Sequence, residues 1–141
     1  MPRDSAPERV RGRVFSAQNF GFLVIGVAVF GGLGSVIRLG LSHWHSYLPW
    51  GILLGNTLAS GVVGFVYPLA HSGSVGWVFW GTLLATGLAG GLSTFSSWAA
   101  QTLHLMVNRE SRQGFLNFVL NLALPVIAAV AGMILGSILL K

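Results

Sequence analysis

The stretch that decides the fold is Gly90-Gly91-Leu92-Ser93-Thr94-Phe95-Ser96-Ser97-Trp98, which interrupts a long apolar segment. Two glycines followed by hydroxyl residues continue a helix poorly. Each glycine costs up to about 1 kcal/mol relative to alanine, and serine or threonine can bond the nearby backbone instead. Inside a bilayer, an opened turn is tolerated only where protein, water or an ion satisfies the freed backbone groups. The stretch therefore indicates a break inside a membrane helix, with close packing through small residues as the alternative.

The composition is that of an integral membrane protein. The chain has 141 residues, of which 53% are hydrophobic and only 8% are charged, whereas soluble domains carry roughly 25% charged residues. No Asp, Glu, Lys or Arg occurs between Leu39 and Asn108, which is enough chain for more than two spans of about 20 residues. The absence of cysteine excludes a disulfide framework and thiolate metal sites.

Residues 1–20 form an arginine-rich polar N-terminal tail. The net charge of +5 comes mostly from Arg3, Arg9, Arg11 and Arg13 in this tail. Such a tail is more typical of a topology signal or of a contact to anionic lipid than of a nucleic-acid arm. We therefore expect no nucleic-acid partner.

Residues 21–141 are expected to form one transmembrane domain of the all-α class, with four transmembrane helices and a broken third helix. The four apolar segments are 21–41, 50–70, 76–106 and 115–140. With four spans, both termini lie on one side of the membrane, together with five basic residues, Arg3, Arg9, Arg11, Arg13 and Lys141; the other side carries two, Arg109 and Arg112. This excess predicts cytoplasmic termini in a multi-pass protein of the cell membrane.

Three asparagines lie within the predicted spans. Asn56 is in the second span, and Asn117 and Asn121 share one face of the fourth because they are four residues apart. A run of neutral amide donors suits a small polar or anionic species better than a cation, because it adds no negative charge. Interhelical hydrogen bonding is the alternative role for these amides.

Two aromatic residues and one arginine complete the set of candidate pathway and anchor residues. Phe95 and Trp98 are three apart and share a helix face, and their positive ring edges can favour an anion weakly. Ordinary packing is the alternative for both rings. Arg38 is the one charged residue within a span. It lies close to the helix end, where it can extend to the interface as a structural anchor.

The positions of the acidic residues exclude most classes of enzyme. Asp4, Glu8 and Glu110 are the only acids, and all three lie outside the predicted spans. No catalytic Ser/His/Asp set can form within the membrane, and an exporter that depends on an intramembrane carboxylate is also excluded. We expect that the chain is not an enzyme.

Together these residues resemble the Fluc/CrcB family of fluoride channels. Three features match. They are Gly31-Gly32-Leu33-Gly34 followed by Arg38, Pro49-Trp50-Gly51 leading to Gly55-Asn56, and the interrupting stretch at residues 90–98. The family's third-helix signature looks like GGxTTFSTF, and here it reads GGLSTFSSW. The resemblance covers residues 21–140. It implies an antiparallel dual-topology dimer with two fluoride pathways, which exports toxic fluoride passively from the cytoplasm.

The resemblance also implies roles for particular residues. The carbonyls of Gly90 and Ser93 match those that hold a structural Na⁺ at the dimer interface. Asn56 matches the family's fluoride donor on the second helix. Phe95 and Trp98 match its two pore phenylalanines. A polar row on the fourth helix begins at two further positions, Asn117 and Asn121.

Several positions depart from the family pattern, and they leave the assembly open between an antiparallel homodimer and a heterodimer. The departures are Trp98 for phenylalanine, Ser93 for threonine, Gln101 for a common glutamate, and Pro125 and Ala129 where hydroxyl residues would continue the row. With the arginine bias, they favour the hypothesis that the chain pairs with an oppositely oriented homologous subunit. The alternatives are a non-conducting or partly conducting partner subunit and a small dimeric exporter of the multidrug type, which would need a carboxylate in the first helix.

Overall fold

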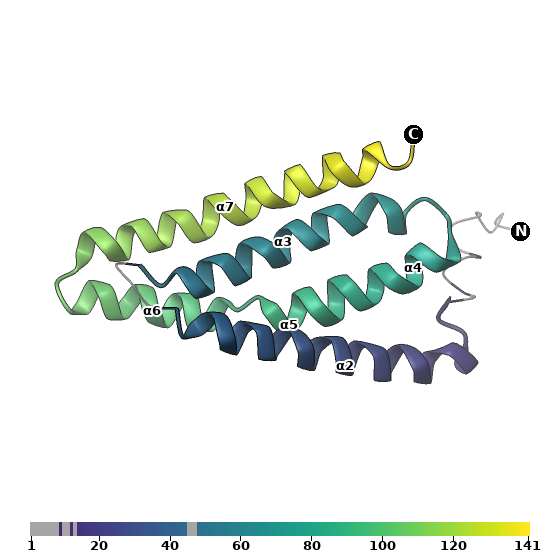
Figure 1. Ribbon diagram of the computed structural model, residues 1–141, viewed down its shortest axis with the longest axis horizontal. Helices are drawn as coiled ribbons and strands as arrows, with labels where there is room; N and C mark the ends of the chain where they lie inside the picture. Colours follow the sequence, from purple (N-terminus) through teal and green to yellow (C-terminus); the bar gives the residue numbers. More distant parts are fainter. Residues whose placement is uncertain (1–8, 10–11, 13, 45–47) are drawn as a thin grey trace, which may run out of the picture.

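The computed structural model describes residues 9, 12, 14–44 and 48–141, and these form a bundle of long helices (Figure 1). In chain order the elements are α2 (Ala17–Ser42), α3 (Trp50–Ala70), α4 (Val75–Thr82), the π-helix η1 (Leu83–Ala89), α5 (Gly90–Leu92), α6 (Phe95–Val107) and α7 (Ser111–Ile138). Four helical segments are long and apolar enough to cross a membrane: Asn19–Ser42, Trp50–Ala70, Val75–Val107 and Ser111–Ile138. The predicted all-α class with four spans is confirmed.

The ends of the helices follow local signals in the sequence. Helix α3 has the predicted bounds, because it begins directly after Pro49 and ends in a turn that contains Gly73 at φ 81°. Helix α2 begins at Ala17, inside the segment assigned to the tail. Helix α7 begins at Ser111, four residues before the predicted apolar span. A helix can continue past its apolar part into polar residues, so hydropathy alone places such ends poorly. Arg3, Arg11, Arg13 and His45 lie outside the described residues.

The third membrane segment changes its backbone conformation twice. Its α-helix widens into the π-helix η1 and narrows again into the single turn α5. Ser93 (φ −79°, ψ 151°) and Thr94 (φ −154°, ψ 121°) then have extended backbone, and α6 begins at Phe95. The hydroxyl of Thr94 caps α6 by accepting the backbone N–H of Ser97, so the hydroxyl residue starts the new helix.

Close approaches of backbone at glycines hold the helices together. A Cβ on Gly64 of α3 would fall onto the carbonyl oxygen of Ala129 in α7, and a Cβ on Gly91 of α5 would fall onto the carbonyl oxygen of Gly31 in α2. Glycines at such crossings let membrane helices pack closely. Helix α3 packs along α7, while α2 packs on η1 and α5. These contacts place the extended turn at 93–94 beside the middle of the bundle.

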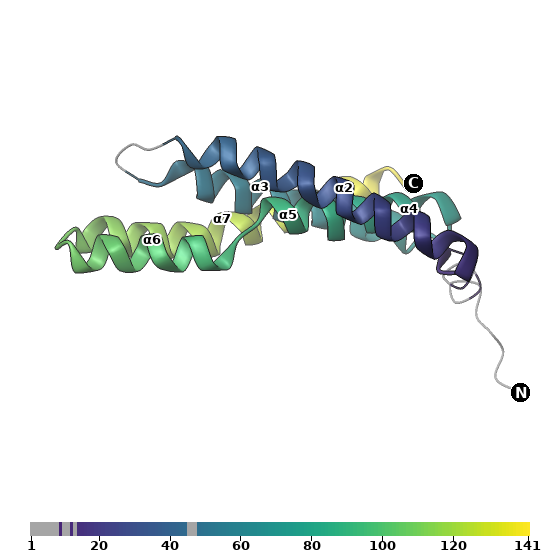
Figure 2. The same ribbon diagram turned by 90° about the horizontal axis from the view of Figure 1, so that it is seen from below.

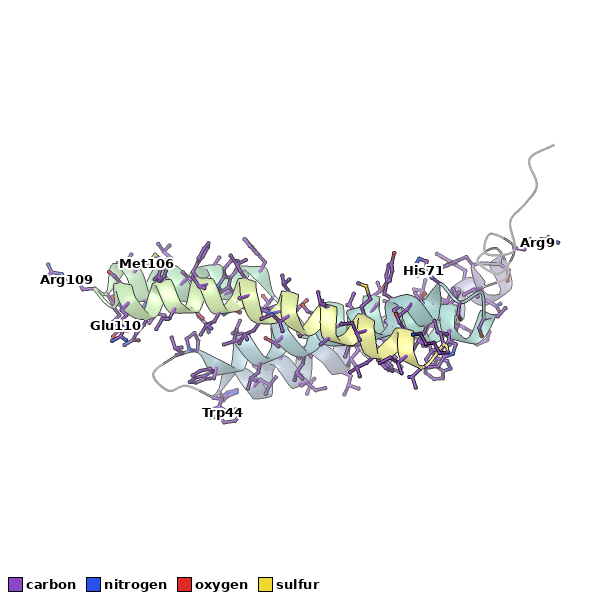
Figure 3. The ribbon with its side chains drawn as sticks, turned by 90° about the horizontal axis from the view of Figure 1, so that it is seen from above. Arg9, Trp44, His71, Met106, Arg109 and Glu110 are labelled. Carbon is purple, nitrogen blue, oxygen red and sulfur yellow. The ribbon has the colours of Figure 1, made fainter. Side chains whose placement is uncertain are left out.

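The two ends of the bundle differ in shape. Helix α2 begins and α7 ends at the same end of the bundle (Figure 1). At the opposite end, the hairpin of α2 and α3 diverges from the hairpin of α6 and α7 (Figure 2). Figure 3 shows Arg109 and Glu110 at the tip of the α6–α7 hairpin and Trp44 near the tip of the other. The extended turn lies where the two hairpins separate (Figure 2).

Candidate functional site

The extended turn is bonded by a side chain from another helix. The backbone N–H of Thr94 donates to Oδ1 of Asn56 at 2.8 Å, and Nδ2 of Asn56 donates to the Thr94 carbonyl at 3.3 Å. One amide on α3 therefore satisfies both backbone groups of Thr94. Satisfaction of this kind is what an opened turn requires in a bilayer.

The amide of Asn56 begins a row of hydrogen bonds that crosses three helices. Its Nδ2 also donates to Oδ1 of Asn121 on α7 at 3.1 Å. Nδ2 of Asn121 donates to Oδ1 of Asn117 at 3.0 Å and to the Asn117 carbonyl at 3.1 Å. Nδ2 of Asn117 donates to the hydroxyl of Thr102 on α6 at 2.8 Å. We call Asn56, Asn121, Asn117 and Thr102 the amide row.

The amide row is largely removed from the surface of the chain. Asn117 is 1% exposed, and Thr102 and Asn121 are each 7% exposed. Buried amides with partners on three helices are stable, whereas each lost partner leaves a costly unsatisfied group. The structure thus brings together all three asparagines that the sequence analysis selected.

The two aromatic candidates lie in different environments. Phe95 is 75% exposed, whereas Trp98 is 8% exposed. Trp98 stacks on Phe118 with ring centroids 5.5 Å apart, and its Nε1 donates to the Asn117 carbonyl at 3.3 Å. The Phe95 ring meets the Trp98 ring edge-on at 5.1 Å. Phe95 therefore faces out of the chain, while Trp98 joins α6 to α7.

A pocket of about 340 Å³ is lined by most of the candidate pathway residues. Its lining includes Asn56, Thr94, Phe95, Trp98, Asn121 and Pro125. It offers amide donors and aromatic rings, and none of its lining residues carries a formal charge. Pro125 has no backbone N–H to give to the Asn121 carbonyl four residues earlier, so this carbonyl lacks its usual helical donor.

A second pocket of about 230 Å³ adjoins the first, with which it shares Ser60 and Ser93. Its lining includes Gly90 and Ser93 and is otherwise made of small residues and one valine. In a continuous helix the N–H of Thr94 would bond the Gly90 carbonyl, and the N–H of Ser97 would bond the Ser93 carbonyl. Those two N–H groups bond Asn56 and the Thr94 hydroxyl instead. The two predicted carbonyl ligands have thus lost their helical donors.

Two further polar side chains stand apart from the amide row. Arg38 is half-buried near the end of α2, and its side chain makes no hydrogen bond or ion pair within the described part of the chain. Oε1 of Gln101 is buried without a hydrogen-bond partner among the described residues. Neither residue contacts the amide row through a hydrogen bond.

Thr94 and Thr102 are the members of the site that sequence reasoning did not select. The sequence analysis included Thr94 only as one residue of the stretch that interrupts the third helix, without a role of its own. Thr102 follows Trp98 by four residues and so shares its helix face, which was the available signal. Its link to Asn117 joins α6 and α7 and depends on their packing.

Comparisons with known proteins identify the family of the chain. The family described as "CrcB-like protein, Camphor Resistance (CrcB)" matches residues 25–133, a range that contains the whole site. The chain is 36% identical over 120 residues to a "Fluoride-specific ion channel FluC" of Parabacteroides distasonis, covering 81% of this chain and 89% of that protein. It is 35% identical over 117 residues to the protein of the same name from Pyrococcus abyssi, covering 81% and 92%. The Thermococcus onnurineus protein of that name is 32% identical over 119 residues, covering 82% and 97%. The chain therefore belongs to the CrcB family.

Proposed function

We propose that the chain forms a passive, fluoride-selective channel that lets toxic fluoride leave the cytoplasm across the cell membrane. The observation that carries the proposal is the row of neutral amide donors beside the extended turn at Thr94. The relatives named fluoride-specific ion channels support fluoride as the ion. The chain is not an enzyme, because its family is one of ion channels.

The chemistry of the pocket suits fluoride. A channel must replace the water around an ion, yet bind it weakly enough for it to leave. The amides of Asn56 and Asn121 contain N–H donors without a formal charge, and hydrogen bonds within the chain occupy these donors in this structure. The edge of Phe95 adds a weak positive potential. A lysine or arginine in the same place would hold the anion more strongly and slow its release.

We further propose that a structural Na⁺ binds the carbonyls of Gly90 and Ser93. Unwound carbonyls of broken membrane helices are suitable Na⁺ ligands, and these two have lost their helical donors. The ion would accept both carbonyl oxygens as ligands and so replace the hydrogen bonds that the two carbonyls have lost. Small lining residues leave the pocket room for it.

Exchange of Na⁺ for N-methylglucamine, a bulky organic cation that cannot replace a bare metal ion among carbonyl ligands, should weaken the assembly. We expect the purified protein to lose its dimeric state and its thermal stability in the exchange buffer and to regain both when Na⁺ returns. Size-exclusion chromatography with light scattering measures the first, and a melting curve measures the second. Identical behaviour in both buffers would rule out a structural Na⁺.

We propose that two subunits pack antiparallel, with the termini of this chain in the cytoplasm. Phe95 and Ser93 are exposed on a single chain, and both pockets at the turn are open, so a second subunit would complete their walls. The basic residues near the termini favour one orientation of this chain. A homodimer would need both orientations, so the bias favours a heterodimer with an oppositely oriented homologous subunit.

Expression of this chain alone tests the heterodimer. We expect little fluoride efflux from liposomes that contain only this chain, and efflux when a homologous subunit of opposite charge bias is expressed with it. Cysteine accessibility at an introduced Ser137→Cys, read from both sides of the membrane, reports the orientation in the same samples. Robust efflux from the lone chain, with labelling from both sides of the membrane, would refute the hypothesis that this chain requires a homologous partner subunit.

A partly conducting partner subunit is the second candidate function. The observation that favours it is the wall formed by Pro125, because its ring leaves the Asn121 carbonyl without a helical donor. A free acceptor disfavours an anion at that point. A multidrug-type exporter has no comparable support, since the first helix contains no acid.

Export in cells is tested by growth. A bacterial strain that lacks its own fluoride channel should grow in millimolar fluoride when it expresses this chain with its partner. An unchanged fluoride sensitivity, with the protein present in the membrane, would contradict the proposed role.

A further inference from the structure

The hydrogen bonds of the amide row all run in one direction, and the extended turn sets that direction. The two ends of an asparagine amide have nearly the same shape, so only their partners show which end is oxygen. The backbone N–H of Thr94 can only donate, and it lies 2.8 Å from Oδ1 of Asn56. That bond fixes the orientation of Asn56, and each following amide must then accept from the one before it and donate to the next.

This direction closes the row to an anion. Between Asn56 and Asn121 a donor faces an acceptor at 3.1 Å. An anion at this point would meet one N–H and one oxygen. It would be bound well only if Asn121 turned its amide to present N–H as Asn56 does, because both groups would then donate.

Such a turn of Asn121 requires Asn117 to turn as well. When the Asn121 oxygen replaces its nitrogen beside Asn117, the Asn117 amide must present N–H in that direction and oxygen towards Thr102. A hydroxyl can accept or donate by rotating about one bond, so Thr102 can terminate the row in either direction. The turned Asn121 oxygen must also move away from the Asn117 carbonyl, from which its nitrogen now lies 3.1 Å, because two acceptor oxygens repel. The Asn117 carbonyl keeps the indole N–H of Trp98 as a donor.

We propose that Thr102 is a positioning residue that allows the amides of Asn117 and Asn121 to turn together when fluoride enters beside Asn56. The fixed end of the row is the N–H of Thr94, and the reversible end is the hydroxyl of Thr102. Thr102 need not touch the ion. This inference rests on the proposed fluoride function and assigns a role to a residue outside the pocket at the turn.

Two substitutions of Thr102 separate the hydroxyl from the shape of the side chain. Thr102→Val removes the hydroxyl with nearly the same volume, and Thr102→Ser keeps it. In liposomes that also contain the homologous subunit, we expect fluoride flux through the pathway of this chain to fall by about tenfold in Thr102→Val, the equivalent of one hydrogen bond. In Thr102→Ser it should stay within about twofold of the wild type. Thr82→Val is the matched control, because the Thr82 hydroxyl donates to the Val78 carbonyl of its own helix and bonds no other group among the described residues. Wild-type efflux from Thr102→Val would overturn the proposal.

Side-chain NMR of the wild-type protein is a second test of the proposal. It remains available if a variant fails to fold. The chain has five asparagines, Asn19, Asn56, Asn108, Asn117 and Asn121, so ¹⁵N-asparagine labelling yields few amide signals. We expect added NaF, compared with NaCl, to shift the signals of Asn117 and Asn121 with the same concentration dependence as Asn56. In Thr102→Val the Asn117 signal should no longer shift with fluoride concentration as the Asn56 signal does.

The two failures are distinguishable. If the wild-type protein carries fluoride while its Asn117 signal stays fixed, only the role of Thr102 is overturned. If the wild-type protein, assembled with the homologous subunit, neither carries fluoride nor shows a fluoride-dependent shift, the proposed function and the role of Thr102 fall together.

Discussion

Replacement of Asn56 with aspartate is expected to reduce the fluoride flux through the pathway that contains it by about three orders of magnitude. Two like unit charges 4 Å apart repel by about 4 kcal/mol at an effective dielectric constant of 20, and each 1.4 kcal/mol changes an equilibrium about tenfold. The carboxylate would still accept the N–H of Thr94 but could not donate to Asn121, so the amide row would also lose its second bond. Fluoride efflux from liposomes that contain the chain together with the homologous subunit, normalised to monodisperse protein, measures the effect.

The neutral variant Asn56→Ser is the control for charge. It keeps a donor of smaller size and adds no charge, so it should retain considerably more flux than Asn56→Asp. Unchanged fluoride flux in Asn56→Asp would refute a pathway role for Asn56. Equal losses in both variants would show that charge repulsion is not the cause.

The second large effect is expected from Gly91→Ala. The added methyl group would meet the backbone of Gly31, where α5 crosses α2, and backbone cannot move aside as a flexible side chain can. Overpacking of this kind costs about 1–3 kcal/mol. Because α5 ends at the extended turn, the shift should also disturb the bond between Thr94 and Asn56. We expect a lower melting temperature in detergent and a lower fluoride flux.

The neighbouring glycine provides a matched control. A Cβ on Gly90 would lie 3.9 Å from its nearest neighbour, the Ala85 carbonyl oxygen, which is ordinary van der Waals contact. Gly90→Ala should therefore leave the packing of the single subunit intact, and its effects should be confined to the dimer. If both variants lower the melting temperature of the separated subunit equally, helix propensity rather than the α2–α5 crossing explains the loss.

Helix number and most boundaries were predictable because hydropathy and span length determine them. The absence of charge between Leu39 and Asn108 and the turn at Gly73 were sufficient for this part. The π-helix over Leu83–Ala89 was not predicted, because nothing in its sequence of small and apolar residues distinguishes a wide turn from an α-helical one. Its shape depends on α2 packing against it.

The candidate site was predictable only along single helices. The four-residue spacing placed Asn117 and Asn121 on one face, and the three-residue spacing did the same for Phe95 and Trp98. Spacing within a helix cannot show which partner helix a face meets. The burial of Trp98 against Phe118 and the bond from Asn117 to Thr102 both depend on how α6 packs on α7.

The central claim is that this chain contributes a fluoride pathway, and ion efflux from liposomes tests it most directly. Liposomes loaded with potassium fluoride or potassium chloride would carry the chain together with a homologous subunit, and valinomycin would start the efflux. A fluoride or chloride electrode would record it. We predict rapid fluoride efflux that Asn56→Asp in this chain diminishes, while chloride stays inside. Fluoride retention equal to that of protein-free liposomes, or equal release of chloride, would contradict the account.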